Sequence, residues 1–220
     1  MLEFTLMTKE QSELLLPLCK DNIGGTEGYS SLISGEDNFF WAGRDEDGHI
    51  KSLAFDNSDE FIKVFGDSFP PFLTFNEKCL MVYENNGKVF SSKKCEIKSI
   101  TGKELLPVLR LLGEGKMTFD DERRYVTRLR YVNRGLSAVF GIYSDGVPVC
   151  CAFVGAVNEK YALISNVFTK KEFRGRGYAA LCVAKCISYS LEKGLIPYLR
   201  CEENMRSYYE KSGFVCYGKM

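Results

Sequence analysis

A short glycine-containing loop between an apolar strand and an apolar helix constrains this chain more than any other feature. Residues 161–168, YALISNVF, are typical of a buried strand, and the loop Arg174-Gly175-Arg176-Gly177-Tyr178-Ala179 follows five residues later. The first amides of a helix lack intrahelical partners and carry the positive end of its dipole, so this arrangement predicts a phosphate-binding site. The glycines let a ligand approach the backbone, and the arginines offer paired donors to phosphate oxygens. The predicted helix has one apolar stripe, formed by Ala180, Ala184, Ile187 and Leu191.

Three other phosphate or nucleic-acid motifs do not fit the sequence. Around Gly115-Lys116, Arg110 occupies the first glycine position of a P-loop and Met117 follows the lysine. The dinucleotide pattern G-x-G-x-x-G fails because Ala180 stands in place of the last glycine and no ribose-binding acid lies at the expected distance. An RGG-type RNA contact is disfavoured because the segment is single, short and bounded by regular structure.

Composition and charge predict a globular protein without general affinity for polyanions. The 29 basic and 29 acidic residues give zero formal net charge, so we expect no nucleic-acid partner. The N-terminus has no charged start followed by an apolar stretch, and no apolar run could span a bilayer, so we expect no membrane association. Nine scattered cysteines without a C-x-x-C pair are typical of a reducing compartment, and we expect a cytoplasmic protein without disulfides.

No metal site is expected. Cys182 and Cys186 are one helical turn apart, but no nearby cysteine or histidine completes a ligand set, so packing in the core is favoured. The only histidine, His49, follows Asp47-Gly48 in a predicted turn and is expected to be solvated.

The chain repeats its own opening, which predicts two related halves, residues 1–93 and residues 94–220. Each half begins with a strand, a capping-box pattern (Thr8 with Gln11, Thr101 with Glu104) and a leucine-rich helix. In each, an Asp-Gly pair then predicts a β-hairpin. A third match sets NEK at residues 76–78 before LMVY against NEK at residues 158–160 before ALI. The alternative explanation for these matches is that the order strand, helix and hairpin is common in unrelated proteins.

The second half reads as an α/β fold with a mixed sheet, antiparallel at the front and with a β-α-β unit behind. Its predicted strands are 95–100, 136–143, 147–155, 161–168, 196–201 and 214–218. Its predicted helices are 102–112, 120–131, 177–193 and 203–211.

These motifs resemble the GNAT superfamily of N-acetyltransferases over roughly Lys94 to Met220. The family pattern [QR]-x-x-G-x-[GA] after the fourth strand is met by Arg174, Gly177 and Ala179. The segment from Tyr209 to Phe214, YEKSGF, is similar to the family's Y-x-K-x-G-F element. The resemblance implies a GNAT-like fold, with the N-terminal half as a degenerate and truncated repeat.

The resemblance also implies acetyl-CoA as cofactor and a primary amine, on a small molecule or a protein, as acceptor. The pantetheine arm would pair with the strand backbone at Val167, Phe168 and Thr169. Tyr209 would protonate the departing thiolate, and Asn204 is a further cofactor contact. The amides that would hold the pyrophosphate are those of Arg174, Gly175, Arg176, Gly177, Tyr178 and Ala179.

Several points stay open in the sequence. Ser165 and Asn166 stand where some relatives have a glutamate base, and Glu202 and Glu203 are base candidates for which exposed solvated roles are favoured. The acceptor, the acyl chain length and the choice between monomer and homodimer are undetermined. A non-catalytic acyl-CoA-binding module is the alternative function.

The resemblance leaves the family's final strand unaccounted for after Phe214. We therefore expect the first half to cover or extend the sheet and to wall the acceptor site. Acidic and aromatic residues of that half are candidates to line this wall, although solvated or core roles are favoured: Asp21, Glu27, Tyr29 and Trp41.

Overall fold

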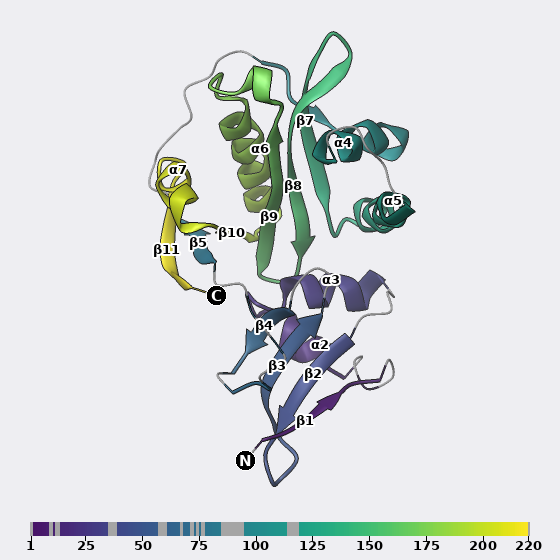
Figure 1. The fold of residues 1–220 in the computed structure, drawn as a ribbon, viewed down its shortest axis with the longest axis vertical. Helices are drawn as coiled ribbons and strands as arrows, with labels where there is room; N and C mark the ends of the chain where they lie inside the picture. The colour runs from purple at the N-terminus through teal and green to yellow at the C-terminus, as the bar shows by residue number, and fades with distance from the viewer. Residues whose placement is uncertain are drawn as a thin grey trace.

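The computed structural model describes residues 2–8, 11, 14–34, 39–56, 61–66, 68–70, 73, 75, 78–84, 95–113 and 119–219. Two sheets form the molecule (Figure 1). The first has the order β1-β2-β3-β4 and is antiparallel throughout. Its strands are β1 (Glu3–Leu6), β2 (Phe39–Arg44), β3 (Ile50–Asp56) and β4 (Phe61–Phe65), and its helices are α2 (Leu16–Cys19) and α3 (Thr26–Ser34).

The second sheet has seven strands in the order β11-β5-β10-β9-β8-β7-β6. Only β9 and β10 pair in parallel, as expected for a β-α-β unit behind an antiparallel front. Its strands are β5 (Cys79–Tyr83), β6 (Lys98–Ser99), β7 (Ala138–Ser144), β8 (Val147–Val157), β9 (Tyr161–Thr169), β10 (Ile196–Cys201) and β11 (Phe214–Lys219). Its helices are α4 (Leu105–Leu112), α5 (Phe119–Asn133), α6 (Tyr178–Glu192) and α7 (Arg206–Glu210), with short 3₁₀ turns η1 (Gly102–Glu104), η2 (Lys171–Phe173) and η3 (Glu203–Met205).

Strand β5 joins the two halves, because it comes from the first half and lies inside the second sheet. It pairs antiparallel with β10 on one side and with β11 on the other. The expectation that the first half extends the sheet is therefore confirmed. A division at residue 93/94 does not coincide with the division between the sheets, since residues 79–83 belong to the second.

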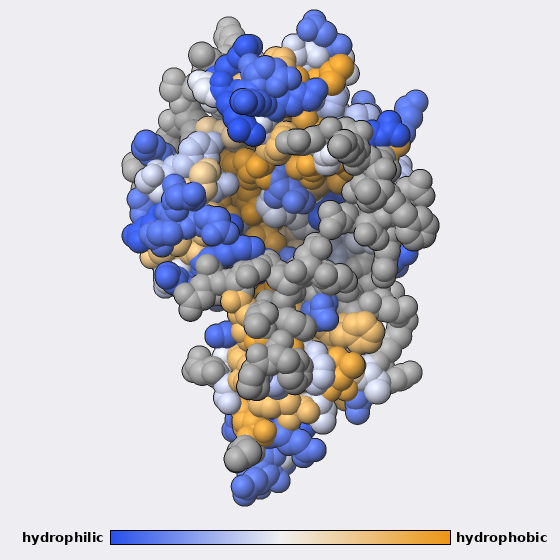
Figure 2. Space-filling model, viewed as in Figure 1, coloured by the Kyte–Doolittle hydropathy of each residue, from blue (hydrophilic) through white to orange (hydrophobic). Residues whose placement is uncertain are grey.

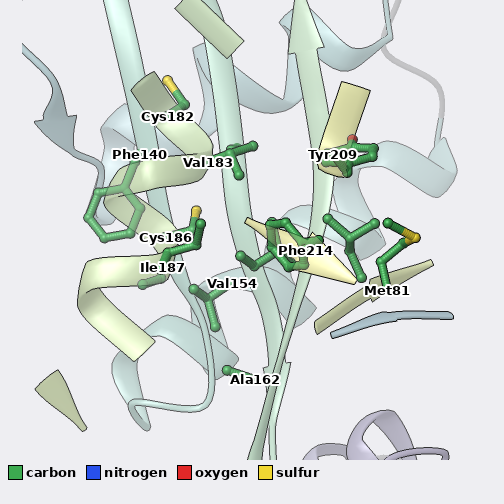
Figure 3. Packing of buried hydrophobic residues seen from close by; sticks show 14 of the residues in the cluster. Met81, Phe140, Val154, Ala162, Cys182, Val183, Cys186, Ile187, Tyr209 and Phe214 are labelled. Atoms are coloured by element: carbon green, nitrogen blue, oxygen red, sulfur yellow. The ribbon is translucent and has the colours of Figure 1, made fainter. Parts of the chain in front are cut away.

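The two faces of the second sheet carry separate cores, and β8 is buried on both. Cys150, Ala152 and Val154 pack on the face of α6, whereas Cys151 and Phe153 pack on the face of α4 and α5. This alternation explains why β8 is continuously apolar. Figure 3 shows the α6 core, which gathers side chains from α6, α7 and strands as distant in sequence as β5 and β11.

The repeated architecture is present, but one of the matches that suggested it is wrong. Both halves run strand, two helices, hairpin and third strand, namely β1 to β4 and β6 to β9. In the first half, however, the third strand is β4, which pairs directly with β3. The segment Leu80–Tyr83, which was matched in sequence to β9, belongs instead to β5. It lies between β10 and β11 in the second sheet and pairs with both. Residues 76 and 77 of the tripeptide lie outside the described residues.

The two predicted capping boxes and the strand before the second one have different outcomes. The Thr8 amide donates to Gln11 Oε1 at 3.0 Å, so that capping box exists. At Thr101 the N-cap has no side-chain hydrogen bond, so the second predicted capping box is wrong. Strand β6 covers only two of the six predicted residues, and among the described strands it pairs with β7 alone.

Candidate active site

The predicted phosphate loop lies at the N-terminus of α6. Gly177 is the N-cap residue of the helix, with φ of 81°, and Gly175 has φ of 73°. Both conformations are left-handed and favour glycine. A Cβ atom at either position would meet no heavy atom within 4 Å, so the space above the backbone is open.

The first amides of α6 are not capped by any side chain of the described residues. Partial positive charge at a helix start is thereby left facing the open space. Basic side chains flank it: Arg174 Nε donates to the Thr169 carbonyl at 3.1 Å, and the Arg176 guanidinium lies 4.9 Å from the centre of the Phe173 ring. Figure 2 shows hydrophilic residues gathered at the upper end of the molecule, where this loop lies in Figure 1, above a hydrophobic region.

Strands β9 and β10 separate before β9 reaches the loop. They pair only from Tyr161–Ile196 to Leu163–Tyr198, although β9 continues to Thr169 and β10 to Cys201. Beyond Leu163, β10 pairs with β5 but no longer with β9. The edge of β9 that carries Val167, Phe168 and Thr169 therefore faces a V-shaped opening, as a bound extended ligand would require.

A β-bulge distorts β9 at the mouth of this opening. Cys151 faces Phe168 and Phe153 faces Ser165, so two residues of β9 oppose one of β8. Asn166, within the bulge, has φ of 51°, which asparagine tolerates better than most residues. Asn166, considered in the sequence only as an unsuitable base, therefore sets the direction of the Val167 amide. An asparagine within an apolar strand was the sequence signal that could have indicated this bulge.

Tyr209 lies in α7 with its ring in the α6 core and is 8% exposed. Its ring centre is 6.1 Å from that of Phe214, and Figure 3 shows its hydroxyl oxygen pointing away from Phe214. Burial raises the pKa of Tyr209 from its ordinary value of 10 to about 12, so the buried hydroxyl holds its proton more tightly than an exposed tyrosine does. Tyr208, expected in the core, is half-buried against the same cluster.

The other candidate residues near α7 differ in their surroundings. Asn204 is exposed in η3, and Glu202 beside it is exposed as well. Glu203 accepts a hydrogen bond from the Cys79 thiol at 2.9 Å and lies 3.6 Å from Arg206. The Cys79 hydrogen bond and the nearby Arg206 hold the pKa of Glu203 below its ordinary value, which makes it a weak base.

A cavity of about 770 Å³ adjoins the loop on the side of α4. Phe168 and Arg174 lie in its lining, so it adjoins the predicted cofactor path. Its other charged lining residues are Arg110, Lys170, Lys171 and Glu172.

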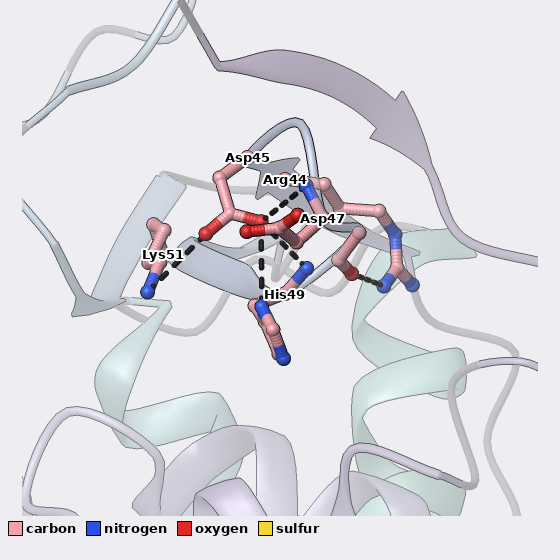
Figure 4. Close-up of polar contacts among 6 residues, drawn as sticks. Arg44, Asp45, Asp47, His49 and Lys51 are labelled. Carbon is pink, nitrogen blue, oxygen red and sulfur yellow. Dashed lines mark hydrogen bonds and ion pairs between the residues drawn. The ribbon is translucent and has the colours of Figure 1, made fainter.

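Metal-ligand geometry within the described residues is confined to Asp45, Asp47 and His49. Figure 4 shows the partners of the Asp45 carboxylate. One of its oxygens accepts hydrogen bonds from the amides of Asp47 and His49, and the other lies 3.3 Å from Lys51 Nζ. The cluster is thus a hairpin turn. His49 is exposed as predicted, and Cys182 and Cys186 lie in the core.

Sequence reasoning missed the polar contacts between the halves, among them an ion pair. Arg200 Nη2 of β10 lies 2.7 Å from Glu27 Oε2 of α3, and both side chains are largely buried. An arginine in the apolar strand IPYLRC was the signal, but its partner is 173 residues away.

None of the described helices has the length and apolar character needed to cross a membrane.

Comparison with known proteins agrees with this geometry. The sequence model of the GNAT acetyltransferase family matches residues 90–218. A GNAT-family acetyltransferase from Colwellia psychrerythraea superposes with a TM-score of 0.65 at 11% identity, covering 99% of this chain and 97% of the other.

Two further solved structures also match almost end to end. A tandem GNAT protein from the clavulanic acid biosynthesis pathway gives a TM-score of 0.62 at 13% identity, covering 100% and 96% of the two chains. A GCN5-related N-acetyltransferase-like protein from Streptococcus suis gives 0.57 at 16%, covering 97% of each. No curated protein sequence matches. At these identities the structural likeness shows the fold, whereas the family match spans more than half of the chain: the protein belongs to the GNAT acetyltransferase family.

Proposed function

We propose that the protein transfers an acetyl group from acetyl-CoA to a primary amine, with both substrates bound together. The observation that carries the proposal is the juxtaposition of two open backbone surfaces. The uncapped start of α6, above Gly175 and Gly177, suits a diphosphate, and the unpaired edge of β9 suits an extended pantetheine arm.

The residues present fit this cofactor. The amides from Arg174 to Ala179 would hold the pyrophosphate, with Arg174 and Arg176 adding charge. The backbone of Val167, Phe168 and Thr169 would pair with the pantetheine arm. When bound, acetyl-CoA supplies the activated thioester, and the Val167 amide, oriented by the bulge at Asn166, would donate to its carbonyl oxygen.

Tyr209 supports the proton transfer that ends the reaction. Its hydroxyl is protonated at neutral pH, and its ring is fixed by the α6 core. A neutral donor held in this way can give its proton to the departing sulfur. Asn204, whose side chain is exposed in η3, would be a further cofactor contact.

The first half, residues 1–93, would form a wall of the acceptor site. Helix α3 supports this role because it packs against β8 and β9 at the closed end of the V-shaped opening. The Ser30 hydroxyl donates to the Val157 carbonyl at 2.7 Å and accepts from the Val157 amide. The Asn158 side-chain amide donates to the carbonyls of Cys19 and Asn22.

The test is thioester turnover with a panel of primary amines: spermidine, L-lysine, kanamycin and a lysine-containing peptide. Release of free thiol that depends on an amine, together with an acetylated product found by mass spectrometry, is expected for at least one of them. Tight binding of CoA with no amine-dependent thiol release would instead indicate a binding module.

A further inference from the structure

The ion pair between Glu27 and Arg200 lies where β9 and β10 separate. Parallel pairing ends at Leu163 and Tyr198, and Arg200 is two residues further along β10. Leu199 and Cys201 belong to the α6 core, so the alternation of a strand places Tyr198 and Arg200 on the opposite face. Helix α3 presents Glu27 to that face from its first turn.

The same alternation places Ser165 of β9 on this face. Ala162 and Ile164 lie in the α6 core, so Leu163 and Ser165 point the other way. A Cβ atom on Gly155 would lie 2.2 Å from the Ser165 hydroxyl oxygen, which confirms that Ser165 projects over β8 on this side. Ser165 on β9 and Arg200 on β10 thus flank the opening, with Glu27 beside Arg200.

The pair lies beside a buried tyrosine, Tyr198. Tyr198 is 2% exposed. Its burial raises the pKa of its hydroxyl, and the nearby Glu27 charge raises it further. The Arg200 and Glu27 side chains are 13% and 20% exposed, so the carboxylate keeps limited contact with solvent. An ion pair in such a place is weak evidence for stability, since apolar residues of similar volume often serve as well.

We propose that Glu27 is the acceptor-binding residue of this enzyme, its carboxylate receiving the ammonium group of the amine at the open side of the β9–β10 separation. This inference rests on the proposed function. Arg200 is a positioning residue, which holds the carboxylate in place by the 2.7 Å contact. The second substrate would then be a cationic primary amine, approaching on the face opposite α6, with one of its contacts supplied by the first half of the chain.

The experiment measures steady-state kinetics with the best amine of the panel, CoA affinity and thermal unfolding. Glu27→Gln keeps the shape of the side chain and removes its charge. Its KM for the amine is expected to rise about 10- to 100-fold, the range for a hydrogen bond to a charged group, with CoA affinity unchanged. Glu159→Gln is the matched control, because Glu159 also contacts the first half, at 3.8 Å from Lys20, but lies at the closed end of the opening. Its amine KM should match the wild type.

The charge-swapped double variant Glu27→Arg with Arg200→Glu separates binding from structure. It retains an ion pair, so thermal stability should recover relative to Glu27→Arg alone, while the amine KM stays high. Recovery of both quantities, or an unchanged KM in Glu27→Gln, would overturn the role. If the double variant does not fold, the amine KM of Glu27→Gln still tests the role of Glu27, provided that its CoA affinity is unchanged. Absence of amine turnover in the wild type would instead refute the proposed function itself, and this role with it.

Discussion

Met81, from the first half of the chain, lies opposite Leu199 of β10 in an antiparallel pair. On the other side of β5 the same residue faces Cys216 of β11. Both Met81 and Leu199 are almost completely buried in the α6 core. The strand that completes the sheet of the predicted active site is thus supplied by residues 79–83, far ahead of that site in the sequence. Separating the halves would remove β5, the strand with which both β10 and β11 pair.

Replacing Met81 by alanine should destabilise the whole protein. Truncation of a fully buried methionine removes apolar contacts and leaves a cavity, which typically costs about 2–5 kcal/mol. Met205→Ala is the control, because Met205 is 41% exposed and should change the free energy of unfolding by less than about 1 kcal/mol. Urea unfolding at equilibrium measures both. Equal small losses would mean that β5 contributes little to the fold.

Glutamate in place of Gly177 should abolish CoA binding while leaving the protein folded. The substitution places bulk and negative charge where the diphosphate is expected, and like charges in contact cost several kcal/mol, or about 100-fold or more in affinity. Gly194→Glu is the matched control at the other end of α6, since Gly194 also has positive φ and open space around it. Both variants bear the same backbone strain, so calorimetric titration with CoA isolates the effect of position. Similar affinities in the two variants would contradict the assignment.

The bulge at Asn166 should tolerate glycine but not valine. Valine is strained at φ of 51°, at a cost of about 1–3 kcal/mol, and would relax by moving the neighbouring amide of Val167. Acetyl transfer should then fall about 10- to 100-fold, because a displaced donor no longer meets the thioester carbonyl. Asn166→Gly should keep most of the activity. Valine and glycine variants of equal activity would show that the bulge does not orient a reacting group.

Tyr209→Phe should lower turnover by about 10²- to 10⁴-fold, the usual contribution of a general acid, without disturbing the packing against Phe214. Tyr208→Phe, one residue away and half-buried, is the control and should retain activity. Full activity in Tyr209→Phe would leave the tyrosine a purely structural role.

The pH dependence of Tyr209 follows from its pKa, which is about 12 in the folded protein against an ordinary value of 10. The protonated hydroxyl is favoured in the fold, so its contribution to stability is complete below pH 10 and is lost as pH rises to about 12. Between those values the wild type should lose more stability than Tyr209→Phe. Equal slopes in alkaline unfolding experiments would contradict the raised pKa.

The parts of the fold that the sequence predicted are those set by local physics. The strand of residues 161–168, the helix starting after Gly177 and the hairpin at Asp145-Gly146 were all found close to their predicted places. In the hairpin both turn residues have positive φ, as the Asp-Gly pair requires. Each of these features depends on a few neighbouring residues.

The parts that the sequence could not predict depend on long-range pairing. Nothing in the apolar segment Cys79–Tyr83 distinguishes a third strand of the first sheet from an inserted strand of the second. That choice depends on β10 and β11, more than 110 residues away. The same holds for Glu27 and Arg200, whose charges are meaningful only once α3 and β10 are adjacent. The separation of β9 from β10 likewise appears only in the strand register.

The central claim is that the uncapped amides at the start of α6 bind a diphosphate. A crystal structure of the full chain with acetyl-CoA tests it most directly. The account predicts diphosphate oxygens within about 3 Å of amide nitrogens between Arg174 and Ala179, and the pantetheine arm beside Val167 and Phe168. Acetyl-CoA bound elsewhere, with this corner of the molecule empty, would contradict it.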